Sequence, residues 1–180
     1  MGNEEGCREI LNDELCGHRV SAMLDAHPDC ACEQHRSNDF SAGPIANNEL
    51  IVHLIMSPID IDPDSNKLRP DVNRDTLSHG MSCVRCKTLD EIDLDEMGRQ
   101  REVLKQDKGH RYMGYVALSA GYLRGLHDTM KRAYCVYDTA LETEPRHAEV
   151  MCNLKEKAKR REFQVKLWGQ MNQCFSRRTH

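Results

Sequence analysis

The stretch Arg111-Tyr-Met-Gly-Tyr-Val-Ala-Leu-Ser119 carries the clearest strand pattern in the sequence. Tyrosine and valine recur within it, and both residue types favour β-strands. Gly114 in the middle of the run indicates a bulge or a close approach by another backbone. We therefore expect a strand at these positions, and the other elements are placed around it.

Two further segments predict strands. The short apolar run at 49–57, Glu-Leu-Ile-Val-His-Leu-Ile-Met-Ser, ends at Pro58, and residues 132–138 contain Tyr and Val at strand-like spacing. Helices are predicted where apolar residues recur every three or four positions or where capping residues occur, at 8–26, 88–106 and 147–175, with one helical turn at 121–126. The sequence thus predicts an α+β fold, in which a small mixed or antiparallel sheet has helical segments at both ends.

The chain divides into three predicted regions. Residues 1–48 are expected to form an acidic helical head and a cysteine-containing linker, residues 49–145 the α+β core, and residues 146–180 a basic C-terminal helix. Charge follows this division, because residues 1–66 hold 13 acidic and 3 basic side chains whereas residues 155–180 hold 2 acidic and 8 basic ones. Ends of opposite charge can attract each other or a charged partner.

Composition limits the size of the core and the class of protein. Hydrophobic residues make up 39% of the 180 residues and aromatic residues 5%, so we expect a modest aliphatic core. The sequence has no apolar run of the roughly 18–20 residues that a membrane span needs, and it shows no signal-peptide pattern. These features predict a cytoplasmic protein without a membrane segment.

The nine cysteines provide the main candidate site. An odd number without a signal peptide argues against a secreted disulfide framework. Two groups have spacings that suit metal ligands, and together they contain Cys30, Cys32, His35, His79, Cys83 and Cys86. Thiolates and imidazoles close together in the chain can bind one Zn²⁺ ion in a tetrahedral site. The sequence therefore predicts that a structural zinc can join the linker to the core.

Two other interpretations of these cysteines stay open. They can be ordinary reduced thiols, or the pair Cys83 and Cys86 can be redox-active. The acidic residues that follow this pair disfavour a thiolate, which weakens the redox interpretation. The isolated Cys135, Cys152 and Cys174 have apolar neighbours, and we expect them to be small buried side chains.

The predicted C-terminal helix at 147–175 has an apolar stripe that includes Leu154, Val165 and Trp168. This stripe can pack on the sheet of its own chain, or it can bind a protein partner or a second copy. The basic residues of the tail also allow binding to nucleic acid, which is an acidic partner. Few aromatic residues lie among them, so base stacking has little support.

Known catalytic motifs are missing from the sequence. It has no phosphate-binding Gly-rich loop, no Gly-x-Ser-x-Gly elbow and no His-Glu-x-x-His. Three histidines, His53, His110 and His147, could carry out acid–base chemistry if the fold brings them together. The favoured function is a small intracellular protein-interaction module, stabilised by zinc, that acts as a subunit or adaptor. The alternatives are a small enzyme using histidine acid–base chemistry and a nucleic-acid-binding accessory protein.

Four short segments carry a resemblance to a known family. They are the strand at 51–58, Met81-Ser-Cys83, the segment 114–125, and Pro145-Arg-His-Ala-Glu-Val150. In this order they resemble a family of short bacterial proteins without an assigned function. The resemblance implies an α+β fold and a bacterial origin, and it implies no activity. The sequence departs from the family pattern at Leu54, where a basic residue is expected, and near 71–76, where a Ser-x-Ala-Phe segment is expected.

Overall fold

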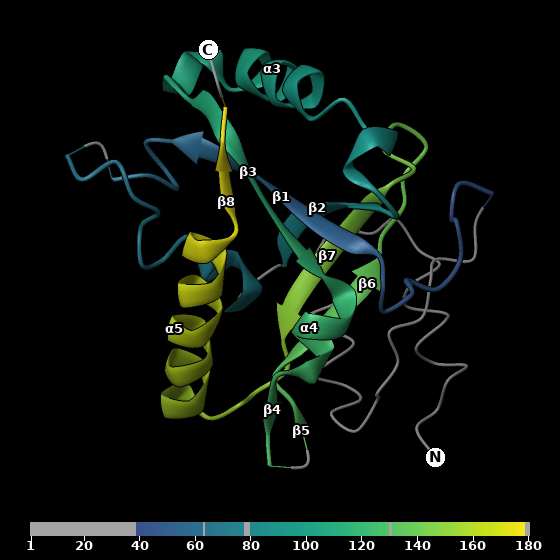
Figure 1. The fold of residues 1–180 in the computed structure, drawn as a ribbon, viewed down its shortest axis with the longest axis vertical. Coiled ribbons are helices and arrows are strands. Elements are labelled where there is room, and N and C mark those ends of the chain that lie inside the picture. The colour runs from purple at the N-terminus through teal and green to yellow at the C-terminus, as the bar shows by residue number, and fades with distance from the viewer. Residues whose placement is uncertain (1–38, 63, 78–79, 130, 179–180) are drawn as a thin grey trace.

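The computed structural model describes residues 39–62, 64–77, 80–129 and 131–178 (Figure 1). In chain order, the helices and strands within these residues are β1 (Leu50–Ser57), η1 (Arg74–Leu77), β2 (Met81–Cys86), η2 (Leu89–Glu91), α3 (Leu94–Leu104), η3 (Gln106–Lys108), β3 (Arg111–Ser119), α4 (Ala120–Gly125), β4 (His127–Asp128), β5 (Lys131–Arg132), β6 (Tyr134–Asp138), β7 (His147–Cys152), α5 (Lys157–Gln173) and β8 (Phe175–Arg177). The predicted α+β class is confirmed. The helix predicted at 8–26 and the rest of the acidic head before residue 39 lie outside the described residues.

Six strands of the described residues form one antiparallel sheet in the order β6-β7-β2-β1-β3-β8. The strand predicted from the clearest pattern is β3, and it pairs with β1 over its whole length. The register shifts between Ile55 and Met56, beside Gly114. A side chain at Gly114 would meet the backbone of Ser176 in β8. The glycine therefore marks both a bulge and a close backbone approach, as its position in the sequence predicted.

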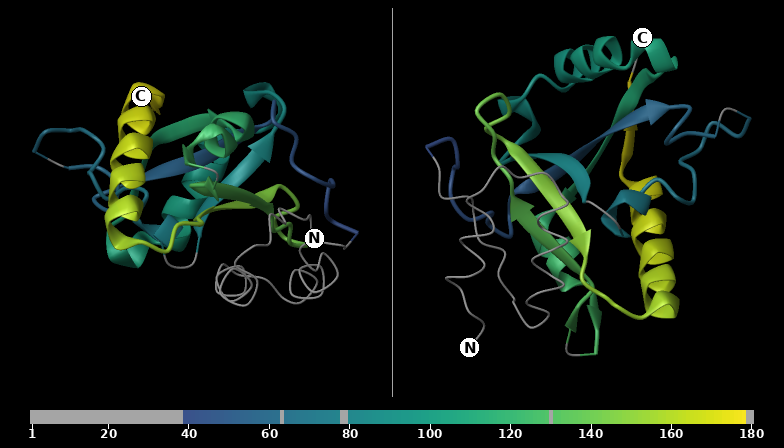
Figure 2. Two further views of the ribbon diagram at one scale, coloured as in Figure 1. Left: turned by 90° about the horizontal axis from the view of Figure 1, so that it is seen from below. Right: turned by 180° about the vertical axis from the view of Figure 1, so that it is seen from behind.

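The sheet separates two hydrophobic clusters. Ile51 and Ile55 of β1 belong to the larger cluster, which includes buried residues of α4 and α5. Val52 and Leu54 belong to the smaller cluster, which includes Leu94 of α3. Successive residues of a strand point to opposite faces, so β1 contributes to both clusters. Helices α3 and α5 lie at opposite ends of the molecule (Figures 1 and 2).

The C-terminal region corrects a prediction. Residues 147–152 are not helical but form β7, which pairs with β2 on one side and β6 on the other. The helix starts only at Lys157. The apolar residues of such a short run fit a helix or a buried strand equally well, so periodicity alone does not separate the two.

Helix α5 packs on the sheet of its own chain, but its buried face differs from the predicted stripe, since Val165 is 57% exposed. Phe163, Leu167 and Met171 follow the spacing of one helix face, and all three are buried in the larger cluster. Trp168 packs at the edge of that cluster and donates a hydrogen bond to the carbonyl of Leu68. Within the described residues, no helix has the length and apolar character needed to cross a lipid bilayer.

Helix α3 begins later than the sequence predicted. Thr88, the first residue of the helix predicted at 88–106, makes no capping hydrogen bond and precedes only the short η2. Asp93 caps α3 instead, since its side chain accepts a hydrogen bond from the backbone N–H of Glu96 at 2.9 Å. The helix contacts the sheet closely at Gly98, where a side chain would overlap the ring of Tyr112. This contact places α3 over β1 and β3.

Candidate functional site

The sheet face below α3 changes from apolar to polar across the strands. Over β1 and β3 it holds the smaller hydrophobic cluster. Over β2 and β7 it presents Ser82 opposite Glu149 and Val84 opposite His147. Partners in an antiparallel pair lie on the same face, so Ser82 and His147 are diagonal neighbours there. Polar residues at these positions need partners, because both side chains are partly buried.

A chain of hydrogen bonds joins these residues. The Oγ of Ser82 lies 3.0 Å from Nε2 of His147. On its other side, the hydroxyl accepts a hydrogen bond of 3.0 Å from the guanidinium of Arg101 on α3. The Nδ1 of His147 lies 2.7 Å from Oγ1 of Thr139, which follows β6. The four groups therefore come from four elements: Arg101 from α3, Ser82 from β2, His147 from β7 and Thr139 from the end of β6.

The donors and acceptors define the direction of this chain. A guanidinium can only donate, so the Ser82 oxygen accepts from Arg101. Nδ1 of His147 also lies 3.3 Å from the backbone carbonyl of Thr139, which can only accept, so the neutral ring carries its proton on Nδ1. Nε2 is then the acceptor, and the Ser82 hydroxyl donates to it. Burial lowers the pKa of His147 below its usual value of 6.5, and the positive charge of Arg101 acts in the same direction. The imidazole is thus neutral at neutral pH and able to accept a proton.

A second histidine contacts the same serine residue. Nδ1 of His53 lies 2.9 Å from the backbone carbonyl of Ser82, so this nitrogen donates. Nearby, burial raises the pKa of Asp60, and the charge of His53 opposes that rise. Burial also lowers the pKa of Lys105, one helical turn after Arg101. By strand alternation, however, the side chain of His53 shares the face of Ile51 and Ile55, and His53 does not line the cavity beside His147.

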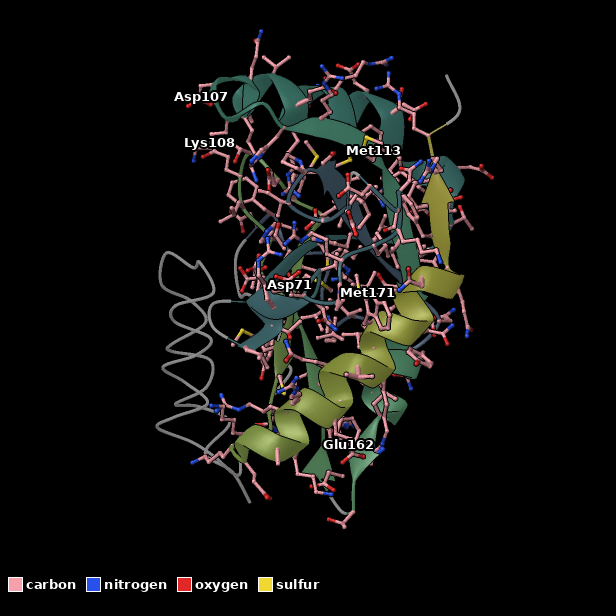
Figure 3. The ribbon with its side chains drawn as sticks, turned by 90° about the vertical axis from the view of Figure 1, so that its left-hand side faces the viewer. Asp71, Asp107, Lys108, Met113, Glu162 and Met171 are labelled. Atoms are coloured by element: carbon pink, nitrogen blue, oxygen red, sulfur yellow. The ribbon has the colours of Figure 1, made fainter. Side chains whose placement is uncertain are left out.

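A cavity of about 280 Å³ opens beside His147. One wall consists of Met97, Gln100, Arg101 and Leu104, which lie on one flank of α3 because their spacing is three or four residues. The segment 143–147 forms the opposite wall, and Leu54, Cys83 and Val84 complete the lining. Figure 3 shows the side chains that occupy the space between α3 and the strands. The site thus has room for a small molecule beside a neutral histidine and an arginine.

Of the six predicted metal ligands, Cys83 and Cys86 are among the described residues, and the structure does not bring these two together. Cys83 and Cys86 both lie in β2, three positions apart, and therefore point to opposite faces of the sheet. Cys83 is buried in the larger hydrophobic cluster and Cys86 in the smaller one. Burial raises the pKa of both thiols, which disfavours the thiolate that zinc or redox chemistry requires.

The other predicted ligands, Cys30, Cys32, His35 and His79, lie outside the described residues. Among the residues that the structure describes, no three His, Cys, Asp or Glu side chains are grouped so as to hold a metal ion. A zinc site that uses the undescribed residues stays a prediction. Of the isolated cysteines, Cys135 is buried as expected, whereas Cys152 and Cys174 are partly exposed.

Sequence reasoning found His53 and His147 but missed Ser82, Arg101 and Thr139. No short motif connects these residues, because Ser82 and His147 are 65 positions apart. The pairing of β2 with β7 brings them together, and neither strand was predicted. The third candidate histidine, His110, lines a different cavity on the other flank of α3.

Comparison with known proteins gives no match to a family model, to a curated protein or to a solved structure. The resemblance to short bacterial proteins therefore stays a prediction. A functional assignment has to be argued from the geometry of the site itself.

Proposed function

We propose that this protein is a small acyl-transfer enzyme in which Ser82 is the nucleophile and His147 the general base. The observation that supports the proposal is the hydrogen bond of 3.0 Å between the Ser82 hydroxyl and Nε2 of His147. A serine is a weak nucleophile until an adjacent base accepts its proton. A neutral imidazole whose other nitrogen is held by a third group is the usual base for this purpose.

The proposed reaction is the hydrolysis of an ester in two steps, acylation of Ser82 and then deacylation by water. The oxygen of Ser82 bonds to the carbonyl carbon while its proton passes to His147, and the carbonyl oxygen becomes an oxyanion. Collapse of this intermediate breaks the ester C–O bond, the leaving alcohol takes the proton from His147, and the acyl group stays on Ser82. Water then attacks the acyl group with His147 again as base. A carboxylic acid is released and Ser82 regains its proton.

Arg101 has two roles in this proposal. Its guanidinium donates to the oxygen of Ser82, so it stabilises the negative charge that develops there as the proton leaves. The same charge favours substrates that carry a carboxylate or another anionic group. The cavity volume of about 280 Å³ is just below the usual range for ligand sites and restricts the substrate to a small molecule. We therefore propose a small anionic ester as the substrate class.

A fluorophosphonate probe tests the proposal without knowledge of the substrate. Such probes phosphonylate an activated serine with loss of fluoride, and mass spectrometry locates the adduct. We expect one adduct per chain, on Ser82, and none in Ser82→Ala. In His147→Gln the labelling rate should fall about 100-fold or more, the range attributed to a positioned base. Ser176→Ala, which removes an exposed hydroxyl of β8, is the matched control and should label like the wild type.

Two results would overturn this proposal. The first is the absence of any adduct on Ser82 in folded wild-type protein, with folding checked by circular dichroism. The second is labelling of Ser82 at an unchanged rate in His147→Gln, since the serine would then react without its base. The interaction module expected from the sequence has less support, because Phe163, Leu167 and Met171 of α5 are buried in their own chain and Val165 is left as an isolated exposed apolar side chain of this helix.

A further inference from the structure

A second cavity lies on the other flank of α3. Its volume is about 620 Å³, and α3 and η3 contribute Arg99, Glu102, Val103 and Gln106 to it. These positions are again spaced by three or four residues, but they are offset from those that face the Ser82 site. Gly109, His110, Arg111 and Arg178 complete the lining. Two separate sites thus share one helix.

The charges around this cavity are mostly positive. Three of the eight lining residues are arginines, and the one carboxylate is Glu102. Oε2 of Glu102 accepts a hydrogen bond from the backbone N–H of Tyr112 at 3.1 Å. This carboxylate oxygen therefore already has a hydrogen-bond partner. The arginines come from three elements or their flanks: Arg99 from α3, Arg111 from the start of β3, and Arg178 from the residue after β8.

The arginines are only partly neutralised within the described residues. Arg99 pairs with Glu96 at 3.0 Å, and both side chains are about half exposed. The guanidinium of Arg178 lies 5.7 Å from the centre of the Tyr112 ring, which holds it by a cation–π contact. Among the described residues, neither Arg178 nor Arg111 forms an ion pair with a carboxylate. In this part of the chain, two arginines therefore face the cavity without an ion-pair partner.

His110 also lines this cavity. The residue is only 9% exposed, and its Nδ1 is covered by protein and has no hydrogen-bond partner among the described residues. A covered atom cannot contact a ligand in the cavity, so the imidazole contributes through the part of the ring that belongs to the lining. The groups that suit a bound oxyanion are therefore the two arginines, with His110 beside them.

We infer that this cavity binds the phosphate group of a small phosphomonoester. Arginine presents parallel N–H donors that match the oxygens of phosphate, and Arg111 approaches from the start of β3 and Arg178 from just after β8. The imidazole of His110 lines the cavity beside them. The volume of about 620 Å³ exceeds what a phosphate ion alone fills and falls within the range of pockets for small organic ligands. This site is independent of the Ser82 chemistry.

Isothermal titration calorimetry with inorganic phosphate and with adenosine monophosphate tests the inference. We expect one site per chain, with the nucleotide binding more tightly because the cavity can hold more than its phosphate. Removing a charge-assisted hydrogen bond should weaken binding about tenfold or more, so Arg111→Ala and Arg178→Ala should each lose that factor. His110→Phe keeps the ring shape and should also weaken binding. Arg161→Ala, which removes an exposed arginine of α5, is the matched control and should bind like the wild type.

Each outcome of these titrations either supports or contradicts the proposed phosphate site. Binding of adenosine monophosphate that is lost in both arginine variants and kept in Arg161→Ala supports it, whether or not inorganic phosphate binds measurably. Failure of both probes to bind the wild-type protein overturns it. Binding that is unchanged in Arg111→Ala and Arg178→Ala also overturns it, since the anion would then be held elsewhere. Circular dichroism of each variant establishes that the fold is intact.

Discussion

The hydroxyl of Ser82 lies 3.0 Å from Nε2 of His147, although β2 and β7 are far apart in the chain. This distance depends on the register in which Val84 lies opposite His147. A shift of one residue would turn Ser82 to the other face of the sheet, into the larger hydrophobic cluster. The candidate site is therefore a consequence of the sheet topology and not of any local motif.

Two helical glycines should respond in opposite ways to the same substitution. A side chain at Gly98 would overlap the ring of Tyr112, so Gly98→Ala should destabilise the protein by about 1–3 kcal/mol through overpacking. A side chain at Gly169 in α5 would meet nothing within 4 Å, so Gly169→Ala should stabilise by about 0.5–1 kcal/mol through helix propensity. Urea unfolding measures both values. Equal effects in the two variants would show that α3 does not contact Tyr112 as described.

The local sequence was sufficient to predict those strands whose own residues favour a strand. The strand Arg111–Ser119 was predicted with its actual bounds, because strand-forming residues and a following helical turn define it. The bulge beside Gly114 was also predicted, since a glycine within a strand often marks a bulge or a close approach by another backbone. Strand β1 was predicted within one residue of its start. These elements form the centre and one side of the sheet.

The elements that were missed depend on tertiary contacts. In β2, the cysteine spacing suggested a metal-binding turn, but Met81, Cys83 and Arg85 alternate with Ser82 and Val84 across a buried strand. Strand β7 was assigned to the tail helix because its few apolar residues fit either structure. Only the pairing of these two strands with each other distinguishes them, and that pairing is not visible in local sequence. The candidate site was missed for the same reason.

A buried arginine should contribute strongly to stability. Arg85 donates to Glu49 at 2.7 Å and to Asp138 at 2.9 Å, and all three side chains are less than one tenth exposed. Arg85→Met would leave two buried carboxylates without their cation and should cost about 3–5 kcal/mol in urea unfolding. Arg146→Met, which breaks an exposed pair with Glu91, should change the unfolding midpoint little. Similar losses in both variants would contradict the burial of the Arg85 network.

The cysteines of β2 should not hold zinc together. Because Cys83 and Cys86 belong to hydrophobic clusters on opposite faces, one ion cannot reach both sulfurs in this fold. The double variant Cys83→Ala/Cys86→Ala should therefore keep the zinc content of the wild type, measured by plasma mass spectrometry of purified protein. Cys30→Ala/Cys32→Ala is the comparison that tests the remaining predicted ligands. Loss of zinc only in the β2 variant would show that the strand opens to bind metal.

His147 should make the protein less stable in mild acid. Burial lowers the pKa of His147 in the folded state below the value of 6.5 that the unfolded chain retains. Between these two pKa values, the unfolded state binds a proton that the folded state does not. Acidification therefore favours unfolding in this window, and the stability that the neutral imidazole contributes is lost as the pH falls below 6.5. Nearby Glu144 and Asp138 act in the opposite direction, so they reduce the effect without reversing it.

Comparison with His147→Gln isolates this contribution, because other titrating groups are common to both proteins. Urea unfolding at several values between pH 7.5 and about pH 5 should show the wild type losing more stability than the variant on acidification. The rate of fluorophosphonate labelling of wild-type Ser82 should fall in acid as well, since a protonated imidazole cannot accept the serine proton. The two losses need not coincide in pH. Unfolding stability follows both pKa values of the histidine, whereas labelling follows only the lower one of the folded state. A wild type that became more stable than the variant in acid would require a raised pKa, and His147 would then be a cation beside Arg101 instead of a base beside Ser82.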